Sequence, residues 1–134
     1  MTLIPAKALI VVADGRKAIV LRNTAASGPV TLHEESRLDP KNLSGEGPSG
    51  SRPNEQTPHQ TDEATFAKQL AHKLFAMHEA GAYQALVLAA DPQTLGQMRP
   101  ALHKTVEAAL VLTLNKDLTN HTTAEIAAAV NHAA

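Results

Sequence analysis

The alternation of hydrophobic and polar residues near the start of the chain predicts three β-strands. Residues 7–23 read KALIVVADGRKAIVLRN, in which two β-branched runs flank Asp14-Gly15. An Asp-Gly pair in this setting favours a type I′ hairpin, which needs positive φ at both central positions. A third run, Val30 to Arg37, alternates apolar and polar side chains as a half-exposed strand does. We therefore expect an antiparallel three-stranded meander.

Helical spacing of apolar residues begins after position 61. Between residues 62 and 80 apolar side chains recur every three or four positions, which predicts an amphipathic helix. Thr61 or Asp62 can cap its start, and Gly81 suits the left-handed position that ends it. The apolar stripe consists of Phe66, Leu70, Leu74 and Met77.

The next stretch predicts a buried strand followed by a short helix. Gln84 to Ala90 is almost continuously apolar, as expected of a central strand covered on both faces. Asp91-Pro92 then reads as an N-cap with proline at the first helical position, and Pro100 should kink or restart that helix.

The last third of the chain ends in a helix. Residues 105–114 suit either helix or strand, and we expect helix at first and strand from about Ala109. Thr122 and Glu125 have the spacing of a capping box, which predicts a C-terminal helix. The order βββαβαβα predicts one α/β domain over residues 1–134, with a mixed five-stranded sheet flanked by helices. Right-handed crossovers give the sheet order 3-2-1-4-5 of ribonuclease H-like folds.

A polar segment of 24 residues, from Leu38 to Thr61, separates the third strand from the first helix. It contains four of the eight prolines and three of the seven glycines, and Leu43 is its only aliphatic residue after Leu38. Loops this long inside compact domains are usually functional or disordered. We therefore expect a long flexible loop at 38–61 and look there first for a working surface.

Composition excludes several classes of protein. The formal net charge of −1 gives no overall basic footprint for duplex DNA, and the absence of cysteine removes disulfides, thiolate metal sites and cysteine nucleophiles. No apolar run reaches the roughly 18 residues that a membrane helix needs. We expect a cytoplasmic protein without a membrane span, a metal or a cofactor.

Five stretches follow one another in a recognisable order and spacing. The stretches are VVADG, Ser51-Arg52-Pro53, FAKQLAHKL, ALVLAADPQTLGQMR and NKDLTN. Together they resemble the bacterial host-attachment protein family, which is related to the central domain of archaeal and eukaryotic peptide-chain release factors. Leu95-Gly96 and Arg99 fit a Leu-Gly-x-Leu-Arg pattern, with Met98 in place of the second leucine.

This resemblance implies a ribonuclease H-like domain and a role in attachment to host cells. It also implies that the 38–61 loop is placed like the release-factor loop that enters the ribosomal peptidyl-transferase centre. That loop carries Gly-Gly-Gln, whereas Gln56 and Gln60 here lack the preceding glycine pair. Peptide release is therefore not carried over.

Two arginines are the strongest candidates for binding. Arg52 in the loop, beside Ser51, and Arg99 near the end of a strand could jointly hold a phosphate or a carboxylate. Alternatively, Arg99 braces the fold through helix carbonyls or through Asp117, which completes the set of candidate binding residues. We predict no catalytic residue.

The carboxylates offer an enzymatic alternative. Asp14, Asp91 and Asp117 could gather at strand ends as the ligands of a metal-dependent nuclease, which needs several carboxylates around its cations. Equally, they are a hairpin residue, a helix cap and a turn residue. The leading hypothesis is a non-enzymatic domain that binds a protein or ribonucleoprotein through the 38–61 loop. A release-factor-like, ribosome-associated RNA-binding factor is the alternative, and the nuclease comes third.

Overall fold

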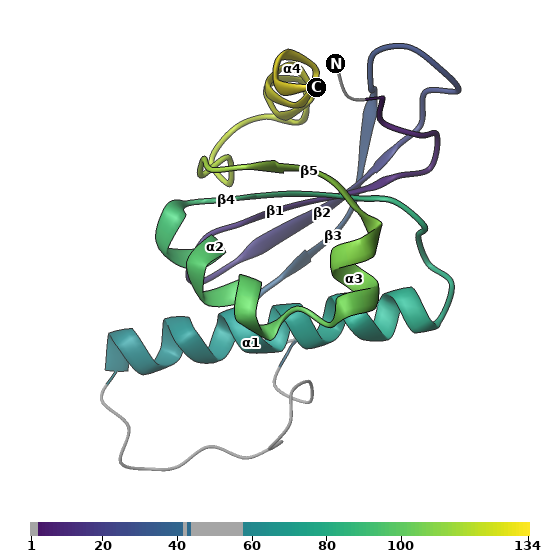
Figure 1. Cartoon of the computed structure of the whole chain (residues 1–134). Helices are drawn as coiled ribbons and strands as arrows, with labels where there is room; N and C mark the ends of the chain where they lie inside the picture. The colour runs from purple at the N-terminus through teal and green to yellow at the C-terminus, as the bar shows by residue number, and fades with distance from the viewer. Residues whose placement is uncertain (1–2, 42, 44–57) are drawn as a thin grey trace.

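Ten helices and strands make up the part of the chain that the structure, a computed structural model, describes (Figure 1). That part comprises residues 3–41, 43 and 58–134, with side chains from residue 64 onward in the last range. The elements are β1 (Leu9–Ala13), β2 (Ala18–Asn23), β3 (Leu32–Leu38), α1 (Pro58–Glu79), β4 (Leu86–Ala90), α2 (Pro92–Met98), the 3-10 helix η1 (Arg99–Ala101), α3 (Lys104–Ala109), β5 (Leu110–Leu114) and α4 (Thr123–Ala133).

The five strands form one mixed sheet in the order β3-β2-β1-β4-β5, as the sequence predicted. The meander pairs antiparallel, while β1, β4 and β5 run parallel. Every residue of β1 and β4 is buried, because helices cover both faces of these central strands. The strand that was expected from about Ala109 begins at Leu110, and α3 precedes it.

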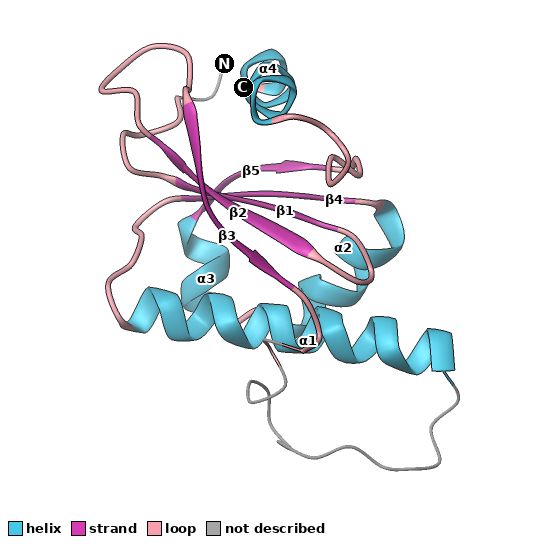
Figure 2. Ribbon diagram, turned by 180° about the vertical axis from the view of Figure 1, so that it is seen from behind, coloured by secondary structure: helices cyan, strands magenta, loops and turns pink. Residues whose placement is uncertain are grey.

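Helices cover the two faces of the sheet in unequal numbers. Figure 2 shows α1, α2 and α3 below the sheet and α4 alone above it. Alternate strand residues therefore enter two separate clusters: Leu9 and Val11 join Phe66 of α1, whereas Ile10 and Val12 join Ile126 of α4. No helix in the described part of the chain is long and apolar enough to cross a membrane.

Helix α1 is longer than its apolar stripe predicted. It begins at Pro58, so Thr61 and Asp62 lie inside the helix and do not cap it. Proline suits the first turn of a helix, where its missing N–H costs nothing. Residues 58–61 of the expected 38–61 loop are thus helical.

Leu43 ties the other end of the 38–61 segment to the core. Its side chain is 0% exposed and packs in the same cluster as Phe66. Its N–H donates to the carbonyl of Asp39 at 3.1 Å. The segment therefore contributes an apolar side chain to the scaffold, and it is not independent of the fold as its polar composition suggested.

Two details of the meander differ from the prediction. Gly15 does not have positive φ, so the β1–β2 turn is not type I′; instead the carboxylate of Asp14 accepts hydrogen bonds from the N–H groups of Arg16 and Lys17. Strand β3 begins after Val30, whose N–H and C=O both bond to the amide of Asn131 in α4. Side-chain hydrogen bonds thus satisfy backbone groups at both connections of the meander.

Three other predicted helix ends are confirmed. Asp91 caps α2 by accepting from the N–H of Thr94 at 3.1 Å, and Gly81 has φ of 78° just after α1. Thr122 and Glu125 form the capping box of α4. There the N–H of Thr122 donates to the Glu125 carboxyl and thereby lowers its pKa.

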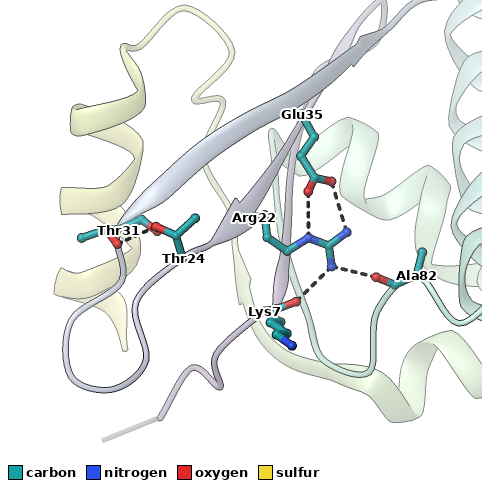
Figure 3. A network of polar contacts seen from close by, with 6 residues as sticks. All are labelled: Lys7, Arg22, Thr24, Thr31, Glu35 and Ala82. Carbon is teal, nitrogen blue, oxygen red and sulfur yellow. Dashed lines mark hydrogen bonds and ion pairs between the residues drawn. The ribbon is translucent and has the colours of Figure 1, made fainter.

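At the end of the sheet where β1 and β4 begin, Arg22 joins several elements (Figure 3). Its guanidinium donates two hydrogen bonds to Glu35, of 3.0 and 3.1 Å, and one each to the carbonyls of Lys7 and Ala82, of 3.0 and 2.7 Å. Lys7 itself has φ of 67°, the left-handed region. Arg22 therefore holds the residues that precede β1 and β4 against the β2–β3 pair.

Candidate functional site at the carboxyl edge of the sheet

Four strands end at the same edge of the sheet. Ala13 of β1 lies opposite Ala90 of β4, and Leu114 of β5 lies opposite the preceding residue of β4. On the other side, Leu38 of β3 pairs with Ala18, the first residue of β2. We call this the carboxyl edge, defined by Ala13, Leu38, Ala90 and Leu114 and the residues that directly follow them. The 38–61 segment leaves β3 at this edge.

The connections of β4 and β5 diverge at the carboxyl edge. The chain leaves β4 into α2 on the face covered by α1, and it leaves β5 towards α4 on the opposite face (Figure 1). In open α/β sheets, ligands bind where neighbouring connections diverge in this way. An open pocket of about 290 Å³ lies here, lined by Pro92, Leu95, Gly96, Arg99, Thr113 and Asn115. We call it the Arg99 pocket.

Arg99 is the charged residue of this pocket. It follows α2 directly and is exposed. Its guanidinium donates to the hydroxyl of Thr113 at 3.5 Å, the long limit of a hydrogen bond, and it forms no ion pair with Asp117 within the described residues. Bracing through Asp117 is therefore wrong. A guanidinium carries five N–H donors, and this hydrogen bond uses one of them.

Asp14 and Asp117 come together through one hydroxyl. The side chain of Thr119 lies 2.6 Å from Asp117 and 3.1 Å from Asp14, and Thr119 is only 4% exposed. The N–H of Thr119 also bonds to Asp117 at 2.9 Å. These contacts hold the loop after β5 against the β1–β2 turn, with Lys17 reaching Asn120 at 3.2 Å beside them.

The third carboxylate of the nuclease hypothesis stays apart. Asp91 uses one oxygen to cap α2, and its other oxygen is buried without a hydrogen-bond partner. Among the described residues, no three acidic or histidine side chains are arranged to hold one metal ion. Asp14 and Asp117 therefore hold the loop after β5 against the β1–β2 turn, and Asp91 caps α2.

Basic residues are spread along the same edge. Arg16 and Lys17 lie in the β1–β2 turn, Lys116 follows β5, and Arg99 follows α2 and contacts Thr113 of β5. The neighbouring carboxylates of Asp14 and Asp117 already accept hydrogen bonds from protein groups. The carboxyl edge therefore carries several basic residues although the whole chain is close to neutral.

Sequence reasoning found part of this site. Arg99 and Asp117 both lie at the carboxyl edge but do not contact each other, while Ser51 and Arg52 lie outside the described residues. Thr113, Asn115 and Thr119 were missed as site residues. The sequence did single out the stretch that holds Asn115 and Thr119, because residues 115–119 and 95–99 both carry the family resemblance. These two stretches meet at the carboxyl edge.

Comparison with known proteins identifies a family over most of the chain. A protein-family model described as bacterial archaeo-eukaryotic release factor family 12 matches residues 7–130. No curated protein matches the chain. The matched range includes all five strands and every residue of the Arg99 pocket. The chain therefore belongs to bacterial archaeo-eukaryotic release factor family 12.

Proposed function

We propose that this protein is a non-enzymatic binding domain whose partner is a ribonucleoprotein, in the first instance the ribosome. Contact would involve the 38–61 segment together with the carboxyl edge beside it. One observation carries the proposal: β3 ends, and the segment begins, at the edge that holds the Arg99 pocket. Membership of a family named for release factors points in the same direction.

The chemistry of the edge suits a partner rich in phosphate. Protein contacts to nucleic-acid phosphates come mostly from Arg and Lys, and they position a protein without reading the sequence. Arg16, Lys17, Arg99 and Lys116 supply such groups along the carboxyl edge. A polar segment rich in proline and glycine can order on binding, which gives modest affinity over a wide surface.

Binding without catalysis follows from what the chain offers for chemistry. The 38–61 segment has no Gly-Gly-Gln, which is the part of the release-factor loop that helps position water. At the carboxyl edge, Asp14 and Asp117 are tied to Thr119. We therefore propose that the domain occupies a site on its partner and does not hydrolyse peptidyl-tRNA or RNA.

Ribosome co-sedimentation tests the proposal directly. The wild-type chain should pellet with ribosomes at low salt and be released as salt rises, since phosphate contacts depend on counterion release. Replacing residues 44–57 with a short Gly-Ser linker, or changing Arg52→Ala, should weaken the association. Lys68→Ala is the matched control, because it removes an exposed charge from α1. If the wild-type chain stays in the supernatant at every salt concentration, the proposal is wrong.

Two earlier expectations stay predictions. A role in attachment to host cells follows only from the resemblance, and no contact in this structure bears on it. A cytoplasmic location is required by a ribosomal partner, and cell fractionation would test it.

A further inference from the structure

We propose that the Arg99 pocket binds one phosphate group of single-stranded RNA, with Arg99 supplying the charge and the missing side chain of Gly96 supplying the room. This inference rests on the proposed function and names the ligand chemistry of the same edge. It concerns only described residues, namely those of α2, η1 and the end of β5.

Gly96 is the observation that first points to a ligand. It lies inside α2 without positive φ, and a Cβ built on it would meet nothing within 4 Å. The fold therefore needs no glycine there, although glycine in a helix interior costs roughly 0.5–1 kcal/mol relative to alanine. Gly96 also lines the Arg99 pocket. We infer that the glycine keeps this space open.

Polar groups from two elements converge on that space. Arg99 comes from the end of α2, while Thr113 and Asn115 come from the end of β5. The guanidinium has one hydrogen bond in the described structure, of 3.5 Å to Thr113. A planar guanidinium with a hydroxyl and an amide beside it matches the several oxygens of a phosphate group.

The size and walls of the pocket limit the ligand. A volume of about 290 Å³ lies just below the roughly 300–1,000 Å³ typical of small-molecule sites. Pro92 and Leu95 form an apolar side. A phosphate and the sugar attached to it fit this description better than a whole nucleotide with its base held in a deep cleft.

The surroundings favour a nucleic-acid chain over an isolated anion. Lys17 in the β1–β2 turn and Lys116 after β5 add further positive charge at the carboxyl edge. Asp14 and Asp117, the carboxylates between them, are engaged by Thr119 and by backbone N–H groups. Several cations suit repeated phosphates, whereas one protein carboxylate would need only Arg99.

The test uses the full chain and a fluorescently labelled oligouridylate, with anisotropy measured at low salt. Arg99→Gln should weaken binding at least about tenfold, which corresponds to about 1.4 kcal/mol. It should also reduce the slope of log affinity against log salt by about 0.7, the value for one phosphate of a single strand. Lys68→Gln is the control of equal charge change on α1, and we expect less than a twofold effect.

Gly96→Gln separates a ligand site from a structural role. Glutamine is a better helix former than glycine, so this variant should unfold at the same temperature as wild type or higher. Its longer side chain would fill the pocket, and oligouridylate binding should fall about as far as in Arg99→Gln. Equal binding of oligouridylate by wild type, Arg99→Gln and Gly96→Gln would overturn the proposal.

Competition identifies the source of the anion. Uridine monophosphate should displace the oligouridylate only weakly. A mononucleotide can occupy the Arg99 pocket but cannot also reach the other basic residues of the carboxyl edge. If wild type binds inorganic phosphate or a glutamate-rich peptide through Arg99 but does not bind oligouridylate, the RNA assignment is wrong. Ribosomes are absent from this assay, so a failure of ribosome association would overturn the proposed function alone.

Discussion

Arg22 and Glu35 meet through two parallel hydrogen bonds, of 3.0 and 3.1 Å, across the β2–β3 pair. The same guanidinium also donates to two backbone carbonyls, so it is more than a surface ion pair. Replacing it with methionine should lower the free energy of unfolding by about 1–3 kcal/mol, because the carbonyl of Lys7 and the partly buried carbonyl of Ala82 lose a charged donor. Urea denaturation measures this difference.

Glu35→Gln provides the comparison for Arg22. The carboxyl side chain is 36% exposed, and exposed ion pairs contribute only about 0–1 kcal/mol. We therefore expect the glutamine variant to lose much less stability than Arg22→Met. Equal losses in the two variants would mean that the carbonyl contacts of Arg22 contribute nothing.

Leu43 should matter to folding despite its polar neighbours. Leu43→Ala is expected to cost about 2–5 kcal/mol, the usual range for removing a fully buried leucine side chain. Leu3→Ala is the matched control, since Leu3 is 81% exposed and its truncation should change stability by less than about 0.5 kcal/mol. Thermal or urea unfolding of both variants checks the contrast. A Leu43→Ala protein as stable as wild type would contradict the core position of this side chain.

Tyr83 should make stability fall at alkaline pH. Burial raises its pKa to about 12, and its hydroxyl donates to the carbonyl of Leu74 at 2.6 Å. The unfolded chain loses this proton near pH 10, so the unfolded state gains stability relative to the folded state between about pH 10 and pH 12. The free energy of unfolding should therefore decrease over this range in wild type and less in Tyr83→Phe.

The titration itself can be followed without interference. Tyr83 is the only tyrosine, and the chain has no tryptophan, so tyrosinate absorbance reports this one group. The folded protein should show neutral tyrosine well above the ordinary pKa of about 10. A midpoint near pH 10 in the folded state would show that the hydroxyl is not sequestered.

Thr119 should be sensitive to loss of its hydroxyl and tolerant of loss of its methyl group. Thr119→Val leaves Asp14 and Asp117 without their shared partner, which we expect to destabilise the fold by about 1–3 kcal/mol. Thr119→Ser keeps the hydroxyl and should lose clearly less. If serine and valine cost the same, packing of the methyl group and not the hydrogen bonds stabilises this loop.

Local patterns were enough to predict the framework. The continuous apolar run at 84–90 indicated a central strand, and β4 occupies 86–90. Asp91-Pro92 and Thr122 with Glu125 marked helix starts through chemistry that acts within three residues. Strand order then followed from the antiparallel meander and right-handed crossovers, which depend on the chain order of elements more than on particular contacts.

Long-range contacts were beyond the reach of the same reasoning. Arg22 bonds to the carbonyls of Lys7 and Ala82, which lie 15 and 60 residues away in sequence. Every residue has a backbone carbonyl, so the sequence does not indicate which carbonyls accept hydrogen bonds from Arg22. Leu43 is one leucine among polar residues and has no periodicity to reveal its burial. The Arg99 pocket lies where the chain leaves β4 towards one face of the sheet and leaves β5 towards the other. The spacing of residues in the sequence does not show to which face a connection turns.

Both ends of the described chain lie together, on the side of the sheet that Arg22 fastens. Ile4 and Ala134 pack into the same cluster beside α4, and Asn131 bonds to Val30 in the β2–β3 connection (Figure 2). An affinity tag, a dye or another domain joined at either end would therefore emerge on the face of the sheet covered by α4, opposite the face that carries α2. Immobilised or fused forms of this protein should keep the carboxyl edge accessible to whatever it binds.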